Sequence, residues 1–181
     1  MNNIIGISGK SKSGKTTLAE HLAAHLGGVV WGFGDEVKMR FYFDGPQYAG
    51  QLWRQDVKDT VLDTGQTIRQ ELVRIGIDRR KDDPDYWVKS WLRTLSNNYR
   101  GMTVIAPDVR FPNEVKVIER IGGIVIRLTR NPDDGQVETE TALDDWQFRH
   151  VIHNDYLTIN QVNYIGLYLV QQHLLRKGVC R

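Results

Sequence analysis

The sequence is poor in cysteine, and Cys180 is the single one among its 181 residues. One cysteine can form no internal disulfide bond, which fits a reducing compartment. No apolar run approaches the ~20 residues that a membrane-spanning helix needs. Met1 leads directly into an apolar, strand-like segment with no signal-peptide pattern. We therefore expect a cytoplasmic protein without a membrane partner.

A surplus of charge is also lacking, since the formal net charge is only +2. This balance argues against a surface built for general nucleic-acid binding, although it leaves room for a local basic cleft. Nucleic acid is thus a partner that the composition disfavours but does not exclude. The hydrophobic share of 40% and the charged share of 25% are ordinary for a globular protein. A chain of this length can bury one substantial core, so we expect residues 1–181 to form a single domain.

What the sequence does contain is a glycine-rich phosphate-binding loop. Residues 9–16 read Gly-Lys-Ser-Lys-Ser-Gly-Lys-Thr, which fits the pattern G-x-x-x-x-G-K-[ST] at every fixed position. The preceding residues 3–8 form a short apolar run typical of a strand, and Leu18, Leu22 and Leu26 recur at helical spacing after the loop. The motif requires this order of strand, loop and helix, so the sequence predicts that the protein binds a nucleotide.

The residue types of the loop explain its chemistry. Gly9 and Gly14 let the backbone curl so that successive N–H groups point at a phosphate, and the start of the helix adds unpaired donors and the positive end of its dipole. Lys15 can reach the β- and γ-phosphates, and the Thr16 hydroxyl can ligate Mg²⁺. The expected nucleotide-binding residues of this segment are Gly9, Lys10, Ser11, Lys12, Ser13, Gly14, Lys15, Thr16 and Thr17.

The rest of the chain alternates strand-like and helix-like segments, which predicts an α/β domain with a parallel sheet. Further strands are expected at residues 28–33, 102–106, 124–129 and 151–152, and further helices at residues 67–76, 84–95, 112–120 and 159–175. Residues 44–65 break the alternation with glycine, proline and aromatics among charges, and we interpret them as an excursion over the site. Residues 130–145 are polar and acidic, as a mobile lid or an ordinary solvated loop would be.

Several short motifs outside the loop indicate a family. They are Phe33-Gly34-Asp35-Glu36-Val37-Lys38, Arg69 with Gly76, Pro84-Asp85-Tyr86-Trp87, Asp108-Val109-Arg110-Phe111-Pro112-Asn113-Glu114, Arg127-Leu128-Thr129-Arg130, Glu140 before Leu143-Asp144, and Val151-Ile152-His153-Asn154-Asp155. With these motifs the chain resembles the phage-type deoxynucleoside monophosphate kinases, which are small P-loop kinases. The resemblance covers nearly the whole chain except residues 44–63, and the motif that begins at Asp108 is its most specific signature.

The resemblance implies a P-loop NTPase fold, with a five-stranded parallel sheet in the order 2-3-1-4-5 flanked by helices. It implies an acceptor-binding helical region at residues 34–100 and a lid at residues 130–148. ATP and Mg²⁺ are the implied cofactors, a deoxynucleoside monophosphate is the implied small-molecule acceptor, and the host cytoplasm is the implied location if the protein is phage-encoded. Related kinases include homodimers, so the resemblance is compatible with a homodimer.

The sequence departs from the family at two positions that bear on the acceptor. Val73 stands where the family often has glutamine, and Val137 stands where it has histidine. The Asp-x-Arg of residues 108–110 is also similar to that of phosphomevalonate kinase. The acceptor therefore stays open among a free deoxynucleotide, a modified nucleotide, a nucleotide within DNA and a phosphomevalonate-like compound.

Phosphoryl transfer to a phosphate acceptor depends on positioning and charge neutralisation, so cations are the expected catalytic groups. Lys15 should bridge the β- and γ-phosphates. Either Arg127 or Arg130 could cover the γ-phosphate, and we prefer Arg130 because alternation along a strand argues against both pointing alike. The resemblance implies that Arg110 binds the acceptor phosphate, with a salt bridge to Glu114 as the alternative. The catalytic candidates are Lys15, Arg130, Arg110 and Asp35.

Each acceptor-binding candidate has a structural alternative. Asp35 could orient the acceptor or a Mg²⁺-bound water, or it could cap a helix. Lys38 and Arg69 could instead be exposed helix cations. Asp108 could belong to the magnesium shell or hold Arg110 in place. The acceptor-binding candidates are Asp35, Lys38, Arg69, Trp87, Asp108 and Arg110.

Aromatic, amide and lid residues complete the set of candidates. Trp87 and Tyr86 could stack on an acceptor base or pack between helices. The resemblance implies that Asn154 and its neighbours flank the donor adenine through backbone contacts. Glu140 could make a contact in the lid or cap a helix.

His21 and His25 are one helical turn apart and could suggest a metal site. They lie off the leucine stripe and lack a third ligand, so we interpret them as a solvated face.

A competing class of function is a nucleotide-dependent switch or ATPase that makes no phosphorylated product. A guanine-reading N-K-x-D motif is absent from the sequence, and Asp108 is followed by Val109 where motor ATPases commonly have a catalytic glutamate. Both absences count against this class, and we expect a kinase.

Overall fold

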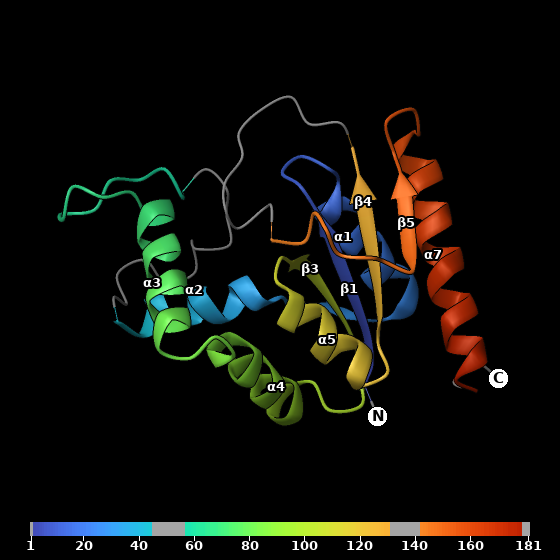
Figure 1. The fold of residues 1–181 in the computed structure, drawn as a ribbon, viewed down its shortest axis with the longest axis horizontal. Helices are drawn as coiled ribbons and strands as arrows, with labels where there is room; N and C mark the ends of the chain where they lie inside the picture. Colours follow the sequence, from blue (N-terminus) through green and yellow to red (C-terminus); the bar gives the residue numbers. More distant parts are fainter. Residues whose placement is uncertain (1, 45–56, 131–141, 179–181) are drawn as a thin grey trace. The chain divides into compact units, whose positions relative to one another are not determined.

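The computed structural model describes three stretches of the chain, residues 2–44, 57–130 and 142–178 (Figure 1). The chain divides into two compact units, one made of residues 1–32 with 94–181 and the other of residues 33–93. The second unit contains most of the expected acceptor region, residues 34–100, whose role stays a prediction. No helix among the described residues combines the length and the apolar character that crossing a membrane requires.

Five parallel strands form the sheet of the first unit, in the order β2-β3-β1-β4-β5 (Figure 1). The strands are β1 (Asn3–Gly9), β2 (Val29–Val30), β3 (Thr103–Val109), β4 (Ile124–Thr129) and β5 (His150–His153). All residues of β1 between its two ends are buried, as expected for a strand that is covered on both faces. The predicted fold class and strand order are confirmed.

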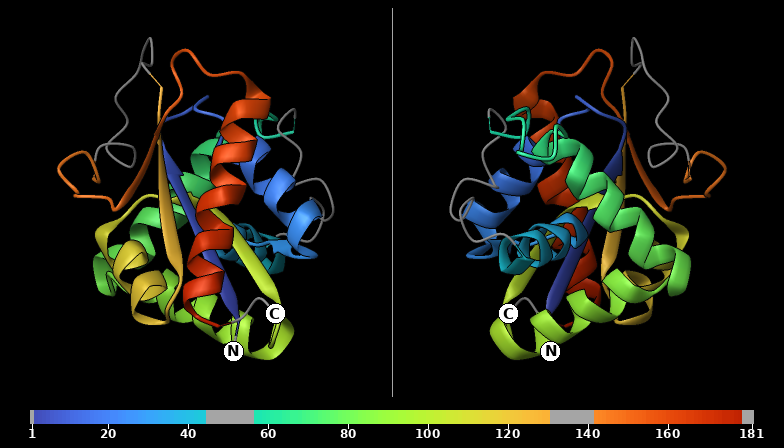
Figure 2. Two further views of the ribbon diagram at one scale, coloured as in Figure 1. Left: turned by 90° about the vertical axis from the view of Figure 1, so that its right-hand side faces the viewer. Right: turned by 90° about the vertical axis from the view of Figure 1, so that its left-hand side faces the viewer.

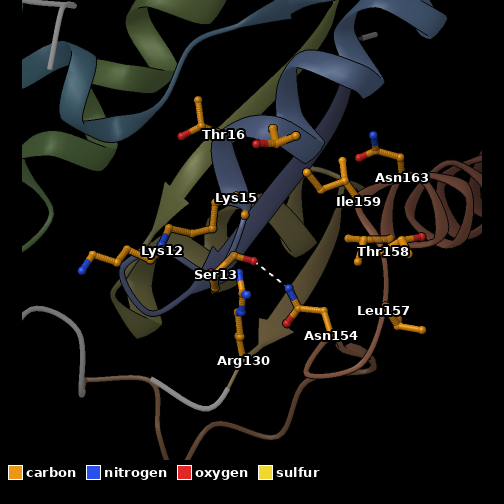
Figure 3. Close-up of a pocket in the computed structure, with 13 residues that line it drawn as sticks. Lys12, Ser13, Lys15, Thr16, Arg130, Asn154, Leu157, Thr158, Ile159 and Asn163 are labelled. Atoms are coloured by element: carbon orange, nitrogen blue, oxygen red, sulfur yellow. Dashed lines mark hydrogen bonds between the residues drawn. The ribbon is translucent and has the colours of Figure 1, made fainter. Parts of the chain in front are cut away.

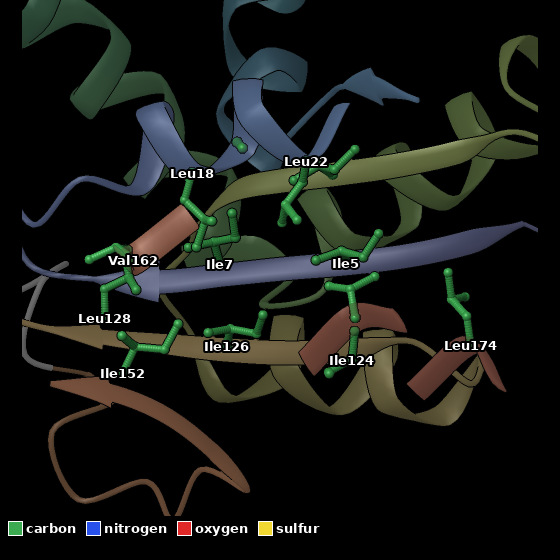
Figure 4. Packing of buried hydrophobic residues seen from close by; sticks show 13 residues of the cluster. Ile5, Ile7, Leu18, Leu22, Ile124, Ile126, Leu128, Ile152, Val162 and Leu174 are labelled. Atoms are coloured by element: carbon green, nitrogen blue, oxygen red, sulfur yellow. The ribbon is translucent and has the colours of Figure 1, made fainter. Parts of the chain in front are cut away.

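Helices α1 (Lys15–Leu26) and α7 (Ile159–Arg176) cover one face of this sheet, and α5 (Pro112–Arg120) covers the other (Figure 2). Figure 4 shows Leu18 and Leu22 of α1 and Val162 of α7 meeting the isoleucines of the central strands. The buried side chains of this layer include Ile5, Ile7, Leu18, Leu22, Ile124, Ile126, Leu128, Ile152, Val162, Val170 and Leu174. With Ile105 of β3 also in this cluster, the core fixes the start of α1, where the glycine loop ends, against four strands and α7.

Gly6 explains how closely α5 approaches the opposite face of the sheet. Its neighbours Ile5 and Ile7 point toward α1, so Gly6 points toward α5. A Cβ atom at Gly6 would lie 2.8 Å from Ile118 Cδ1, which leaves no room for a side chain. The absence of a side chain at this position thus allows α5 to pack directly on β1.

The second unit contains α2 (Phe33–Asp44), α3 (Ile68–Asp82) and the start of α4 (Tyr86–Asn98). Phe41 and Ile68 form its small core, against which Leu72 and Ile75 of α3 pack. Phe33 and Trp91 lie with ring centroids 4.5 Å apart. A capping box of Thr67 and Gln70 begins α3.

Several element boundaries differ from the sequence-based prediction. The strand expected at residues 102–106 extends to Val109, and the helix expected at residues 84–95 is Tyr86–Asn98. The strand expected at residues 28–33 is only Val29–Val30, and Phe33 already begins α2. A short apolar run flanked by glycines does not distinguish a strand from a helix start. The helix expected at residues 67–76 runs on to Asp82, because Gly76 is tolerated within α3.

Candidate functional site

The glycine loop connects β1 to α1 and has the geometry of a phosphate cradle. Gly9 and Gly14 have φ values of 154° and 92°, which residues with a side chain rarely adopt. A Cβ atom at Gly9 would lie 2.5 Å from Ser13 Oγ and 2.7 Å from the Leu128 carbonyl oxygen. Glycine is therefore required at position 9 by both the backbone angle and the space.

The N-terminus of α1 is left open for an anion. Its N-cap residue is Gly14, which has no side chain to cap the helix, and the first turn of α1 contains no acidic residue. By contrast, the side chains of Thr67 and Thr158 cap α3 and α7. An uncapped helix start presents unpaired N–H groups and a positive dipole end, which suit a phosphate.

Lys15 spans the loop. Its Nζ donates hydrogen bonds of 2.7 Å to the Gly9 carbonyl oxygen and 2.6 Å to the Lys10 carbonyl oxygen. The ammonium group is thus held over the curled backbone, where the β- and γ-phosphates of a nucleotide would lie.

A cavity of about 560 Å³ opens beside the loop, within the first unit (Figure 3). Figure 3 shows loop residues and Arg130 on one side of it and residues of α7 on the other. The lining residues are Lys12, Ser13, Gly14, Lys15, Thr16, Thr17, Arg130, Asn154, Leu157, Thr158, Ile159, Val162 and Asn163. Seven of the predicted nucleotide-binding residues, those from Lys12 to Thr17 with Asn154, thus come together in one cavity.

Asn154 joins the loop after β5 to the glycine loop. Its Nδ2 donates to the Ser13 carbonyl oxygen at 2.8 Å, and its backbone N–H donates to the Thr129 carbonyl oxygen at 2.9 Å. Asn154 is 8% exposed. Two buried polar atoms beside this contact, Ser13 Oγ and Asn154 Oδ1, have no hydrogen-bond partner among the described residues. The sequence predicted a backbone role for this residue, and the structure adds a side-chain role.

Arg127 and Arg130 point to different environments. Arg127 is 9% exposed and donates to Ser8 Oγ at 2.9 Å and to Asp144 Oδ1 at 3.1 Å. Its guanidinium also lies 5.4 Å from the ring centroid of Phe148. Arg130 is exposed and lines the cavity. This placement agrees with the preference for Arg130 as the arginine at the phosphate end, while Arg127 is engaged in packing.

Asp144 connects Arg127 to the glycine loop. Its Oδ2 lies 3.6 Å from Lys10 Nζ, while its Oδ1 accepts the hydrogen bond from Arg127. The last part of the expected lid is thereby attached beside the loop. Val137, Glu140 and most of the lid expected at residues 130–148 fall within 131–141, outside the described residues.

Asp108 lies at an irregularity near the end of β3. Gly6 pairs with Ala106 but Ser8 pairs with Val109, so β3 has one more residue than β1 at this point. A Cβ atom at Gly32 would lie 2.0 Å from Asp108 Oδ1. The Asp108 carboxylate therefore occupies the space over Gly32, at the carboxyl edge of a parallel sheet, where such sheets bind ligands.

Glu114 binds the backbone next to Arg110. Its Oε2 accepts hydrogen bonds from the N–H groups of Arg110 at 2.7 Å and Phe111 at 3.1 Å, and its side chain is buried. This carboxylate therefore orders the turn from β3 into α5. The Arg110 side chain is exposed.

The second unit holds the remaining acceptor candidates. Asp35 was expected after a strand, but it lies in the first turn of α2, is 7% exposed and forms an ion pair of 2.6 Å with Lys38. Arg69 is exposed, and its Nε donates to Asp59 Oδ1 at 3.1 Å.

Trp87 is placed as a core residue. It is 2% exposed, its Nε1 donates to the Gly76 carbonyl oxygen at 3.0 Å, and Tyr86 meets it edge to face at 4.8 Å. The surface that base stacking would need is covered, so the structure favours the packing alternative and we correct the substrate-binding assignment of Trp87. Tyr86 in turn has the Arg79 guanidinium 5.4 Å from its ring centroid.

His21 and His25 stack on each other with ring centroids 4.0 Å apart. Burial, and secondly the neighbouring His25, lower the pKa of His21 from its usual 6.5. The described part of the chain contains no group of three His, Cys, Asp or Glu residues able to hold a metal. The interpretation of the two histidines as a solvated helix face stays a prediction.

Sequence reasoning missed the α7 side of the cavity. Leu157, Thr158, Ile159, Val162 and Asn163 line it but belong to no motif. One signal was available for part of this set, because Thr158 and Gln161 form a capping box that marks the start of α7. Asn163 could have been noticed only as a polar residue on an apolar helix face.

Comparisons with known proteins agree with this geometry. No protein-family model matches the chain. A protein of Acanthamoeba polyphaga mimivirus named "Putative deoxynucleotide monophosphate kinase" is 29% identical over 175 residues, which cover 87% of this chain and 88% of that protein. Shikimate kinase from Bacteroides thetaiotaomicron superposes with a TM-score of 0.54 at 15% identity, covering 96% of this chain and 98% of that one. Shikimate kinase from Aquifex aeolicus superposes with a TM-score of 0.51 at 13% identity, covering 95% and 98%.

The similarities to solved structures support the assignment of the fold. The glycine loop and the cavity support the position of the candidate site. Taken together with the viral relative, they identify this chain as an enzyme with the P-loop kinase fold.

Proposed function

We propose that the protein transfers the γ-phosphate of ATP to a deoxynucleoside 5′-monophosphate, giving the diphosphate and ADP. An oxygen of the acceptor phosphate forms a bond to the γ-phosphorus, and the bond from that phosphorus to the β–γ bridging oxygen breaks. The observation that carries the proposal is the cavity that begins at an uncapped, glycine-lined helix start with Lys15 across it. The acceptor comes from the name of the mimivirus relative and from the motifs of the sequence.

On the donor side, the loop N–H groups would cradle the β-phosphate, and Lys15 would bridge the β- and γ-phosphates. Arg130, on the same cavity, would cover the γ-phosphate and neutralise charge that develops in the transition state. The Thr16 hydroxyl would be the protein's Mg²⁺ ligand, since Thr16 lines the cavity and follows Lys15 in the loop motif. Mg²⁺, when bound, would supply charge neutralisation on the β- and γ-phosphate oxygens.

On the acceptor side, we propose that Arg110 binds the acceptor phosphate, with Asp108 and Asp35 orienting the acceptor and Lys38 and Arg69 as further cations. Residues 34–100 would form the acceptor region and residues 130–148 the lid. The reaction would take place in the cytoplasm, where ATP and the monophosphates are found. In this proposal no residue abstracts a proton, because a phosphate oxygen is already a competent nucleophile.

One observation favours a second candidate acceptor. Val73 is 47% exposed on α3 and stands where the resembled family often has glutamine. An apolar side chain at this position would suit an acceptor whose base carries an apolar or modified group, so a modified deoxynucleotide is the second candidate.

The test is ADP release from ATP with each deoxynucleoside and ribonucleoside monophosphate, with modified deoxynucleotides, with a DNA oligonucleotide and with phosphomevalonate. We expect turnover with at least one free deoxynucleoside monophosphate and little ATP hydrolysis without an acceptor. Lys15→Ala should show no turnover above background. Turnover with none of the free monophosphates would overturn the acceptor. Rapid ATP hydrolysis without any acceptor would indicate a switch or ATPase instead.

A further inference from the structure

Asn163 is a polar residue on a helix face that is otherwise apolar. Asn163 is 8% exposed, and its neighbour Val162 is 7% exposed. Val162, Val170 and Leu174 of the same helix belong to the hydrophobic core. One turn further on, Gly166 packs so closely on Leu18 that a Cβ atom there would lie 2.6 Å from Leu18 Cδ1. The side of α7 that carries Asn163 therefore packs against α1. Moving α7 away would break the contact between Gly166 and Leu18.

The Asn163 carboxamide has no hydrogen-bond partner within residues 2–44, 57–130 and 142–178. The residue as a whole is buried, but its amide atoms are not among the fully buried atoms that lack a partner, so a group in the cavity can reach them. Asn163 is one of the cavity-lining residues, and Figure 3 shows its amide directed away from α7 toward the start of α1. The amide is thus available to a group that enters the cavity.

The position in the cavity indicates which group this is. The glycine loop and Arg130 fix the phosphate end, so the α7 side is left for the base of the same nucleotide (Figure 3). This side is lined by Leu157, Ile159 and Val162, and Ile159 is 66% exposed although it is apolar. Apolar walls with one convergent polar group are typical of a site that encloses a flat, mostly apolar ligand.

A carboxamide offers one N–H donor and one carbonyl acceptor side by side. Adenine presents a matching pair, an amino group next to a ring nitrogen, and asparagine binds adenine in this two-bonded way in other settings. We propose that Asn163 is the residue that reads the base of the donor nucleotide, by hydrogen bonding to the adenine edge that carries the 6-amino group. This inference rests on the proposed function only in that the cavity binds ATP.

The experiment measures equilibrium binding of ATP, GTP and purine riboside 5′-triphosphate, which lacks the 6-amino group, by titration calorimetry. The proteins are the wild type, Asn163→Ala, Asn163→Leu and Asn163→Asp. The control is Asn160→Ala, which removes an exposed asparagine from the same helix outside the cavity. Asn163→Leu keeps roughly the volume of the side chain in an apolar site, so it should fold even if Asn163→Ala does not.

We expect the wild type and Asn160→Ala to bind ATP roughly tenfold more tightly than the analogue, the worth of one good hydrogen bond. Asn163→Ala and Asn163→Leu should bind both with similar, weaker affinity. Asn163→Asp should weaken ATP binding roughly tenfold, because a carboxylate still accepts a hydrogen bond from the 6-amino group but cannot donate one to the ring nitrogen.

Two results would overturn the inference. If Asn163→Leu weakened the binding of ATP and the binding of the analogue by the same factor, the residue would only shape the cavity. Unchanged discrimination in all Asn163 variants would mean that it does not touch the base. If the wild type binds ATP more tightly than the analogue but phosphorylates no acceptor, the proposed function is wrong and the inference about Asn163 still holds. A wild type that binds no purine nucleotide would contradict both.

Discussion

Asn154 donates a hydrogen bond of 2.8 Å from its side-chain amide to the carbonyl oxygen of Ser13, a residue 141 positions earlier in the chain. The contact joins the loop that follows β5 to the middle of the glycine loop. Because Asn154 is also held by its own backbone bond to Thr129, the glycine loop is fixed from the side by the end of β4. The shape of the phosphate cradle therefore depends on a residue far outside its motif.

Substitution at Asn154 should weaken nucleotide binding more than it weakens the fold. Asn154→Ala removes one hydrogen bond but also removes a buried oxygen that has no partner among the described residues. We expect the free energy of unfolding, measured with urea, to fall by about 1 kcal/mol or less. The Kd of ATP should rise roughly two- to tenfold, because the loop is less well ordered.

Asn154→Asp provides the sharper comparison. Its carboxylate would face the Ser13 carbonyl oxygen without a donor in a buried place, so it should reduce the free energy of unfolding by about 2 kcal/mol or more near neutral pH. If Asn154→Asp proved as stable as Asn154→Ala, the hydrogen bond to Ser13 would not exist in solution.

Lys15→Ala should abolish phosphoryl transfer with little effect on the fold. The Lys15 ammonium contacts two loop carbonyl oxygens that lie near solvent, so water can replace it there. We expect kcat to fall by roughly 100-fold or more, because a positive charge at the transferred phosphoryl group is lost. Lys116→Ala is the matched control, since Lys116 is an exposed lysine of α5 that lies 5.8 Å from the ring centroid of Trp146. Similar loss of kcat in both variants would refute the role of Lys15.

Gly32→Ala should destabilise the protein through Asp108. The added Cβ atom would lie 2.0 Å from Asp108 Oδ1, so the carboxylate or the backbone must move. We expect a loss of about 1–3 kcal/mol in the free energy of unfolding, as for other overpacked sites. In the Asp108→Ala background the same substitution should be nearly neutral, because the obstructing carboxylate is gone. Additive losses in a urea-unfolding double-mutant cycle would show that the two residues are not in contact.

Stability should decrease on mild acidification, in part through His150. Burial first, and then the charges of His173, Arg149 and Arg176, lower the pKa of His150 from its usual 6.5. The unfolded state therefore binds the proton more readily than the folded state. The contribution of His150 to stability is complete above pH 6.5 and is lost as the pH falls from there through the lower folded-state pKa.

His150→Gln should therefore flatten the pH dependence of the free energy of unfolding in this window. Urea unfolding of the wild type and the variant at several pH values on both sides of 6.5 measures the difference. Parallel curves for the two proteins would mean that His150 titrates alike in the folded and unfolded states.

Much of the fold and of the glycine loop was predictable because the signals are local. The glycine pattern from Gly9 to Thr16 determines its own backbone, and the leucine spacing after it determines a helix that starts at Lys15. The alternation of strands and helices predicted a parallel sheet, and the family resemblance implied the strand order that the structure has. The preference for Arg130 over Arg127 also followed from a local rule, the alternation of side chains along a strand.

Other features were not predictable, because they depend on contacts between distant segments. Phe33, the first residue of α2, was expected at the end of a strand over residues 28–33, since a short apolar run carries no period of its own. The buried Trp87 donates a hydrogen bond to Gly76 of the neighbouring helix α3, a contact that no motif encodes.

The sequence by itself determined a phosphate-binding loop within a parallel α/β sheet, because glycine angles and side-chain periodicity act over a few residues. Only the tertiary structure decided what faces that loop. The packing of α7 on α1 through Gly166 and Leu18 brings Asn154 and Asn163 to the cavity, and it is a property of the assembled core. The physical reason is that hydrogen-bond partners and buried surfaces are chosen by proximity in space, which sequence spacing does not record.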